Sequence, residues 1–172
     1  MNKQINYFEL LGLEQKYDLD IALVKKQYLI KQSLYHPDRA KGDLQKKEYT
    51  EKSMLLNEAY KILNNDYARA EYILKLNGYE YDDEILKTKL TQNELENILE
   101  QYEIIDELED LASLQKREGE KLLEKKTLIR EIASAFKENN FSAALDLTIR
   151  LKYFNSLLDN IKLKIKYADN RD

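Results

Sequence analysis

The chain is 172 residues long, 35% of its residues are charged, and its formal net charge at pH 7 is -4. It contains no cysteine and a single histidine, which excludes disulfides, cysteine-ligated zinc, thiolate-bound iron–sulfur clusters and a thiol nucleophile. A net negative charge argues against a nucleic-acid-binding domain, and no stretch reaches the roughly 18 apolar residues that span a membrane. We therefore expect a cytoplasmic protein that binds neither nucleic acid nor membranes and needs no metal or other cofactor.

Helix-forming residues dominate the sequence. There are only four glycines and one proline, whereas strands are usually separated by turns that are rich in both. Leu, Glu, Lys, Ala and Gln, which are strong helix formers, are abundant. The composition predicts an all-α protein.

The first two predicted helices carry clear end signals. A short helix over residues 5–11 is followed by Gly12, which suits a left-handed C-cap. A longer helix follows over residues 20–35, and the carboxylate of Asp18 or Asp20 can serve as its N-cap.

Pro37 ends the second helix, because proline removes a helical hydrogen bond and restricts the residue before it. A third helix is predicted over about residues 45–63 and a fourth over residues 67–76, which ends at Asn77 and Gly78. The two long helices on either side of the proline are expected to lie antiparallel around a shared apolar core.

His36, Pro37 and Asp38 form the motif of this half that could carry chemistry. An ordinary loop is one interpretation. Catalysis is a weak one, because the chain has no cysteine and no second histidine and no oxyanion-hole glycine motif surrounds the nearby Ser33. Recognition fits better, since a tight corner would project a ring nitrogen, a rigid ring and a carboxylate outward together.

Basic residues flank this corner. Lys25 and Lys26 lie on the preceding helix, and Arg39 follows the loop. These side chains are either a merely solvated face or part of a surface that docks against an acidic partner, with association steered by complementary charge.

The C-terminal half begins with a helix-start signal. Thr91 and Glu94 have the spacing of a capping box, and the helix is predicted to run to about Ser113. A second helix is predicted over about residues 115–137, and a third follows the turn ENNFS. Short turns between three such helices predict an antiparallel three-helix bundle.

Apolar spacing predicts which faces of the last two helices are buried. On the second helix of the bundle, the predicted face consists of Leu122, Ile129, Ala133 and Phe136. On the third, alternating steps of three and four describe a coiled-coil seam made of Ala144, Leu147, Leu151, Phe154, Leu158, Ile161 and Ile165.

The charged residues of the first predicted helix of the bundle are all acidic. Residues 91–115 include acidic residues throughout and no Lys or Arg, although surfaces usually mix both signs. Ile98, Leu99 and Tyr102 interleave with the acids at helical spacing. Either these three belong to the core beside a solvated acidic face, or the segment is a docking surface with an apolar centre and a polar rim.

The N-terminal half resembles a J domain, the module through which co-chaperones act on DnaK-class, ATP-driven chaperones. The resemblance rests on the order NYFELLGL, KKQY, YHPDR and LNEAYKIL, and it covers residues 5 to about 65. It implies a chaperone-binding surface made of His36, Pro37, Asp38, Lys25, Lys26 and Arg39. Contact there is expected to promote ATP hydrolysis by the chaperone.

The remainder resembles one branch of that family, the HscB-type co-chaperones of iron–sulfur cluster assembly. ARAEYILKLNGYEY resembles their interdomain segment, ILEQYEIIDELED the opening of their C-terminal domain and AALDLTIRLKYFNSL its last helix. The lack of an N-terminal cysteine pair favours the bacterial type. We therefore expect a J domain over residues 1–78, a connector over 79–90 and a scaffold-binding bundle over 91–172.

In this interpretation the protein is a bridge between two partners and not an enzyme. The resemblance implies a DnaK-class chaperone of the HscA-like type and an IscU-like iron–sulfur scaffold protein, which is delivered to the chaperone for cluster transfer. It also implies a scaffold-binding patch made of Ile98, Leu99, Tyr102, Glu103, Asp106, Asp110 and Tyr153. A J-domain protein with a different client and a structural helical adaptor are the alternatives.

Overall fold

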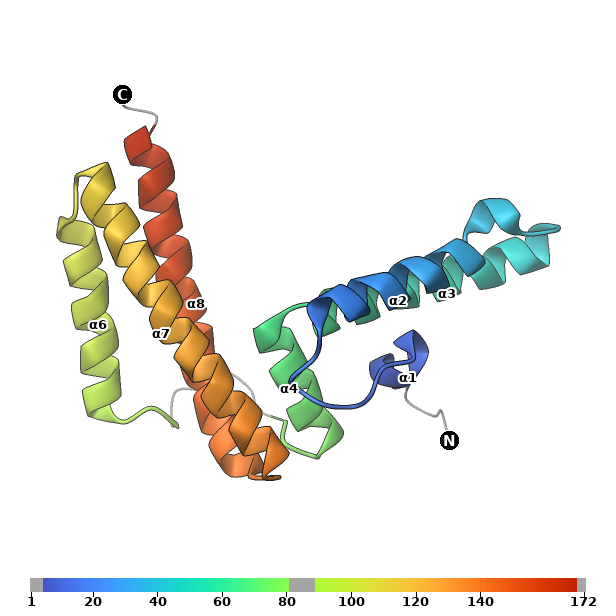
Figure 1. The fold of residues 1–172 in the computed structure, drawn as a ribbon, viewed down its shortest axis with the longest axis horizontal. Coiled ribbons are helices and arrows are strands. Elements are labelled where there is room, and N and C mark those ends of the chain that lie inside the picture. Colours follow the sequence, from blue (N-terminus) through green and yellow to red (C-terminus); the bar gives the residue numbers. More distant parts are fainter. Residues whose placement is uncertain (1–4, 81–88, 170–172) are drawn as a thin grey trace. The chain divides into compact units, whose positions relative to one another are not determined.

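The computed structural model describes residues 5–80 and 89–169, and every regular element in those ranges is helical (Figure 1). The all-α expectation is therefore confirmed. Contacts divide the chain into two compact units, Met1–Ile73 and Leu74–Asp172. Residues 81–88 of the predicted connector lie outside the described residues, and the domain boundaries expected from the sequence stay a prediction.

The first unit is built on a helical hairpin. Its elements are α1 (Tyr7–Leu11), α2 (Ile21–Leu34), a 3₁₀ turn (Pro37–Arg39), α3 (Asp43–Leu63) and the first part of α4 (Asp66–Leu76). The helices α2 and α3 pack against each other, α1 packs against both, and the 3₁₀ turn lies at the tip of the hairpin (Figure 1).

Local interactions set the ends of the first two helices. Gly12 adopts a left-handed conformation with φ of 71° and closes α1, as the sequence predicted. The carboxylate of Asp20, and not that of Asp18, accepts the backbone N–H of Ala22 at 2.9 Å and caps α2.

Tyrosines hold the two long helices of the hairpin together. The ring of Tyr28 on α2 stacks on that of Tyr60 on α3 at a centroid distance of 4.3 Å, and its hydroxyl donates to Asn57 at 2.8 Å. Nearer the tip, the rings of Tyr35 and Tyr49 meet edge to face at 5.6 Å. Because aromatic and hydrogen-bond geometry is directional, these pairs fix the register of α2 on α3.

The guanidinium of Arg69 is buried and fully engaged inside the first unit. Only 3% of the residue is exposed. Its Nε donates to the carbonyl of Tyr17 at 2.8 Å, Nη1 donates to the carbonyl of Leu63 at 2.6 Å, and Nη2 pairs with Asp66 at 2.8 Å. One cation thereby ties the loop after α1, the end of α3 and the start of α4 together.

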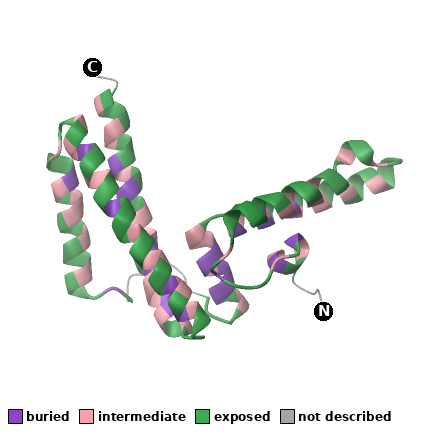
Figure 2. Ribbon diagram, in the orientation of Figure 1, coloured by how far each residue is buried: buried purple, intermediate pink, exposed green. Residues whose placement is uncertain are grey.

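The second unit contains α6 (Gln92–Glu107), α7 (Leu111–Lys137) and α8 (Phe141–Asp169). The helices α7 and α8 pack along much of their length, whereas α6 packs more sparsely and chiefly on α8. Purple segments of α7 and α8 in Figure 2 mark where these helices are buried. The buried residues of α8 are Ala144, Leu145, Thr148, Ile149, Leu151, Leu157, Leu158 and Ile161, which include four of the seven residues predicted for its seam.

The first helix of this unit is shorter than predicted. α6 ends at Glu107, not near Ser113, and Leu108 has extended dihedral angles. The carboxylate of Asp110 accepts the backbone N–H of Ser113 at 2.8 Å and starts α7. A capping aspartate inside an otherwise continuous helical pattern therefore breaks it into two helices.

The predicted buried face of α7 is wrong at Leu122, whereas Ile129, Ala133 and Phe136 are half-buried and Phe136 packs against an apolar cluster of the bundle. Leu122 is 40% exposed, whereas its neighbour Lys121 is only 6% exposed. The buried residues of α7 are Leu114, Lys121, Ile132 and Ala135. A lysine at a core position hides the periodicity, because a sequence pattern counts it as polar although its stem is apolar.

Removing the Arg69 guanidinium is expected to destabilise the first unit strongly. Arg69→Leu leaves two buried carbonyls without their donor and Asp66 without its cation, so we expect a loss of about 2–4 kcal/mol in the free energy of unfolding. Hydrogen exchange of peptides from α1 to α3 in the full chain measures it. Lys61→Leu, at an exposed position of α3, is the matched control, and equal protection in both variants would contradict the role assigned to Arg69.

Candidate functional site

The predicted recognition corner is exposed at the tip of the α2–α3 hairpin. The side chains of His36 and Asp38 are 57% and 85% exposed, and Pro37 opens the 3₁₀ turn between them. The Nδ1 atom of His36 accepts the backbone N–H of Asp38 at 3.3 Å and lies 3.5 Å from its carboxylate. The ring and the carboxylate thus present one compact polar group to solvent.

Other residues hold this corner in place. Arg39 donates from Nη1 to the backbone carbonyl of Ser33 at 2.7 Å, which ties the turn to the last turn of α2. The ammonium of Lys52 on α3 lies 4.2 Å from the centre of the Tyr35 ring, just before the corner. The loop is therefore anchored through its flanks, and His36 and Asp38 face outward.

Lys25 and Lys26 are both exposed on α2. Neither forms an ion pair with another described residue, so both ammonium groups are available to an incoming acidic surface. Within the described residues, no group of three or more His, Asp or Glu side chains could hold a metal ion. None of the described helices combines the length and the hydropathy needed to span a membrane.

The second candidate surface lies on α6 and α8. Leu99 is 62% exposed. Ile98, Tyr102 and Tyr153 are half-buried and pack against apolar clusters of the bundle. The core interpretation of Ile98 and Tyr102 is therefore met in part, and the docking surface stays a prediction.

The acidic residues predicted for this surface have different surroundings. Glu103 and Asp106 are exposed on α6. Asp110 is exposed as well, but it caps α7 and lies in the turn after α6. Hydrogen bonds from Ser113, first from its hydroxyl and then from its backbone N–H, hold the pKa of Asp110 below the usual value.

Residues that the sequence analysis did not single out attach α6 to its neighbours. A terminal nitrogen of Arg150 on α8 lies 2.6 Å from the carboxylate of Glu94. The ammonium of Lys164 donates to two carbonyls at the end of α6, and Arg117 of α7 donates to Gln101 at 2.6 Å. The signal available in the sequence was the lack of basic residues in α6 beside basic residues in α7 and α8.

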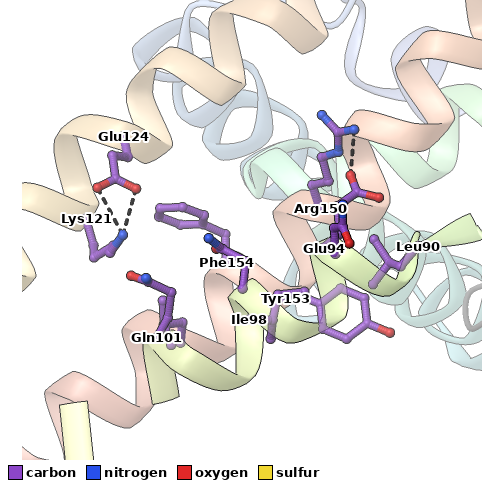
Figure 3. A pocket seen from close by; sticks show the side chains of 12 residues that line it. Leu90, Glu94, Ile98, Gln101, Lys121, Glu124, Arg150, Tyr153 and Phe154 are labelled. Carbon is purple, nitrogen blue, oxygen red and sulfur yellow. Dashed lines mark hydrogen bonds and ion pairs between the residues drawn. The ribbon is translucent and has the colours of Figure 1, made fainter. Parts of the chain in front are cut away.

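A cavity of about 430 Å³ lies between α6, α7 and α8. Its lining includes Ile98 and Gln101 of α6, Lys121 of α7 and Phe154 of α8. Figure 3 shows Phe154 beside Lys121, whose ammonium pairs with both carboxylate oxygens of Glu124 at 3.0 and 2.8 Å. Figure 3 also shows Tyr153 beside Ile98, and Tyr153 lines the same cavity as its neighbour Phe154.

Two family models match the chain, one in each half. Residues 6–72 match the model of the DnaJ domain, and residues 92–162 match that of the HSCB C-terminal oligomerisation domain. Over 161 residues, the chain is 30% identical to the human iron-sulfur cluster co-chaperone protein HscB, covering 92% of this chain and 68% of that protein. It is 34% identical over 159 residues to the co-chaperone protein HscB homolog of Acinetobacter baylyi, covering 91% and 89%.

Solved structures agree with these matches. The crystal structure of human co-chaperone protein HscB superimposes with a TM-score of 0.87 at 28% identity and covers 95% of this chain and 84% of that one. The chaperone HscB from Vibrio cholerae gives a TM-score of 0.82 at 22% identity, with 95% and 99% covered. The second likeness, at its lower identity, supports the fold alone.

Glu94 is expected to make the stability of the bundle depend on pH below about 5. Hydrogen bonds from the backbone and hydroxyl of Thr91, with a smaller contribution from the Arg150 charge, hold the pKa of Glu94 below its ordinary value of 4.5. A carboxyl whose pKa is lowered on folding contributes its stability above the ordinary pKa and loses it as the pH falls through the lower, folded-state value.

Urea unfolding of the full chain between pH 6 and pH 3 measures this contribution. Glu94→Gln should lower the stability at pH 6 and flatten its fall with acid. Glu96→Gln, at an exposed position of the same helix, is the control. An acid dependence in Glu94→Gln as steep as in the wild type would contradict the assignment.

Proposed function

The chain belongs to the HscB family of J-domain co-chaperones in iron–sulfur cluster assembly, and from that membership we propose two specific activities. It stimulates the ATPase of an HscA-like chaperone of the DnaK class, and it delivers an IscU-like cluster scaffold to that chaperone. The observation that carries the proposal is that an exposed histidine–proline–aspartate corner in the DnaJ domain occurs in one chain with the HscB-type C-terminal domain.

The chaperone is proposed to bind the corner and the basic face beside it. His36 and Asp38 supply the exposed ring and carboxylate, and Pro37 stiffens the turn between them. Lys25 and Lys26 steer an acidic surface of the chaperone toward the corner. Arg39, which already holds the turn through Ser33, adds its positive charge to the same face. The proposed surface is made of His36, Pro37, Asp38, Lys25, Lys26 and Arg39.

The scaffold is proposed to bind the bundle. Leu99 offers an exposed apolar anchor, and the half-buried rings of Tyr102 and Tyr153 offer amphipathic contact area beside it. Acidic side chains form the rim and favour a partner with basic residues opposite them. The proposed patch is made of Ile98, Leu99, Tyr102, Glu103, Asp106, Asp110 and Tyr153.

Binding both partners at once is the proposed mechanism. A scaffold held by the bundle reaches the chaperone at a high effective concentration while the J domain engages it, because the second contact becomes intramolecular. ATP hydrolysis then favours the state in which the chaperone holds its client. The co-chaperone binds both partners and triggers hydrolysis when the scaffold is in place, and the chaperone hydrolyses the ATP.

Two rival functions remain and can be separated. A J-domain protein with a different client would stimulate the chaperone but fail to retain the scaffold in a pull-down with the full chain. A purely structural adaptor would do neither, and a change at His36 would leave chaperone hydrolysis unaltered.

Replacing His36 is expected to abolish stimulation of the chaperone ATPase. In the full chain, His36→Gln should reduce stimulation by about tenfold or more, the effect of losing a central interface residue. Asp38→Asn should act in the same direction. Steady-state phosphate release by the HscA-like chaperone measures both, and scaffold binding should not change because the bundle is untouched.

Lys47→Gln, at an exposed position of α3, is the control for nonspecific effects. If His36→Gln stimulated the chaperone ATPase as strongly as the wild type does, the proposed J-domain function would be contradicted.

Shortening Leu99 is expected to weaken scaffold binding and to spare the chaperone. Because Leu99 is exposed, Leu99→Ala tests the surface without opening the core, whereas Tyr102 and Tyr153 are half-buried and also support packing. We expect the dissociation constant for the scaffold to rise about tenfold, measured by calorimetry.

Leu123→Ala is the matched control, because Leu123 is 66% exposed on α7 and lies outside the proposed patch. An equal loss of affinity in the two variants would argue against the patch, and so would no loss in either.

A further inference from the structure

α6 carries most of the proposed scaffold-binding residues, yet packing holds it only loosely. Within α6, all of which the structure describes, Ile105 is the one fully buried residue. A cavity of about 430 Å³ separates it from its neighbours along part of its length. This pocket is open to solvent, so apolar contacts are sparse along that part of α6 and do not by themselves fix where α6 lies on α8.

Two basic side chains of α8 reach α6 near its two ends. Close to the N-terminus of α6, Arg150 lies 2.6 Å from the carboxylate of Glu94, and Figure 3 shows the pair at the edge of the cavity. Close to the C-terminus, the Nζ of Lys164 donates to the carbonyls of Ile105 and Asp106 at 2.8 and 2.7 Å. Together these contacts join both ends of α6 to a single neighbouring helix.

The contact made by Lys164 meets a specific need of α6. The last four carbonyls of a helix lack partners within it, and the C-terminal end of the helix dipole favours a positive charge. α6 has no basic residue in its last turn, so Lys164 supplies the positive charge from α8, and it adds hydrogen bonds to that of Leu108, whose backbone N–H donates to the carbonyl of Ile105. It also lies 3.8 Å from the carboxylate of Asp106.

Such contacts contribute more to position than to overall stability. The side chains of Arg150 and Lys164 are 53% and 27% exposed, and partly exposed ion pairs add little to global stability. A small preference is nevertheless enough to select one position of a helix that packing leaves underdetermined.

We propose that Arg150 and Lys164 are positioning residues for scaffold recognition, a role that rests on the function proposed above. They hold α6 on α8 in the register that makes Leu99 and Tyr102 of one helix and Tyr153 of the other a single binding face. Neither basic residue needs to touch the scaffold. Their loss lets α6 shift and divides the face into two weaker halves.

Single substitutions in the full chain test this role by calorimetry with the purified iron–sulfur scaffold protein. Arg150→Gln and Lys164→Gln should each weaken binding by roughly three- to tenfold. The conservative changes Arg150→Lys and Lys164→Arg, which keep the charge and a donor, should recover most of the affinity.

Matched controls come from α7 and α8. Arg130 is exposed on α7 and forms no ion pair with a described residue. Lys162 contacts Asp159 within α8 at 3.9 Å. Arg130→Gln and Lys162→Gln remove the same charges and should bind the scaffold as the wild type does.

A double-mutant cycle separates positioning from a general loss of charge or stability. If Lys164 positions the face, then Leu99→Ala should cost less affinity in the Lys164→Gln background than in the wild type, because the displaced Leu99 already contributes less. Full additivity of the two changes would overturn the positioning role, and so would unaltered binding by both glutamine variants. If the wild type itself fails to bind the scaffold, the proposed function fails first, and this inference fails with it.

Discussion

Cationic side chains complete the C-terminal ends of three helices in this protein. Arg39, Arg69 and Lys164 donate to backbone carbonyls in the last turns of α2, α3 and α6, respectively. The last carbonyls of a helix lack the partners that its interior supplies, and the negative end of the helix dipole attracts the charge. Each cation comes from outside the helix that it caps, so one interaction both satisfies a helix end and fixes the next element against it.

This arrangement explains how an exposed recognition corner can also be well defined. Within the corner, the Nδ1 atom of His36 accepts the backbone N–H of Asp38, while 57% of the His36 side chain stays exposed. Here the anchoring falls to Arg39 and to the aromatic contacts of Tyr35 with Tyr49 and Lys52. The exposed ring of His36 and carboxylate of Asp38 are therefore preorganised, which reduces the entropy lost on association, while Arg39 both anchors the turn and adds its charge to the proposed surface.

The proposed binding face of the bundle differs from the corner because it spans two helices, α6 and α8. The sparse packing of α6 leaves its position open to the influence of a few polar contacts, while the tight pairing of α7 with α8 provides a rigid base. The acidic composition of α6 is compatible with this arrangement. Its carboxylates attract the basic side chains of α8, and its other exposed acids can contact a partner. A basic residue in the last turn of α6 could have interacted with the C-terminal carbonyls of that helix, and the position of α6 would then have depended less on α8.

The sequence by itself determined the features that depend on neighbouring residues. The helical class, the Gly12 cap, the capping box of Thr91 and Glu94 and the exposed proline corner all follow from interactions over a few positions. The tertiary structure alone decided which face of α7 is buried, since Lys121 occupies a core position by extending its apolar stem and pairing its charge. It also brought the carbonyl of Tyr17 to Arg69 and that of Ile105 to Lys164, across 52 and 59 residues of the chain. Periodicity and capping rules report local geometry, and only packing brings distant carbonyls within reach of a cation.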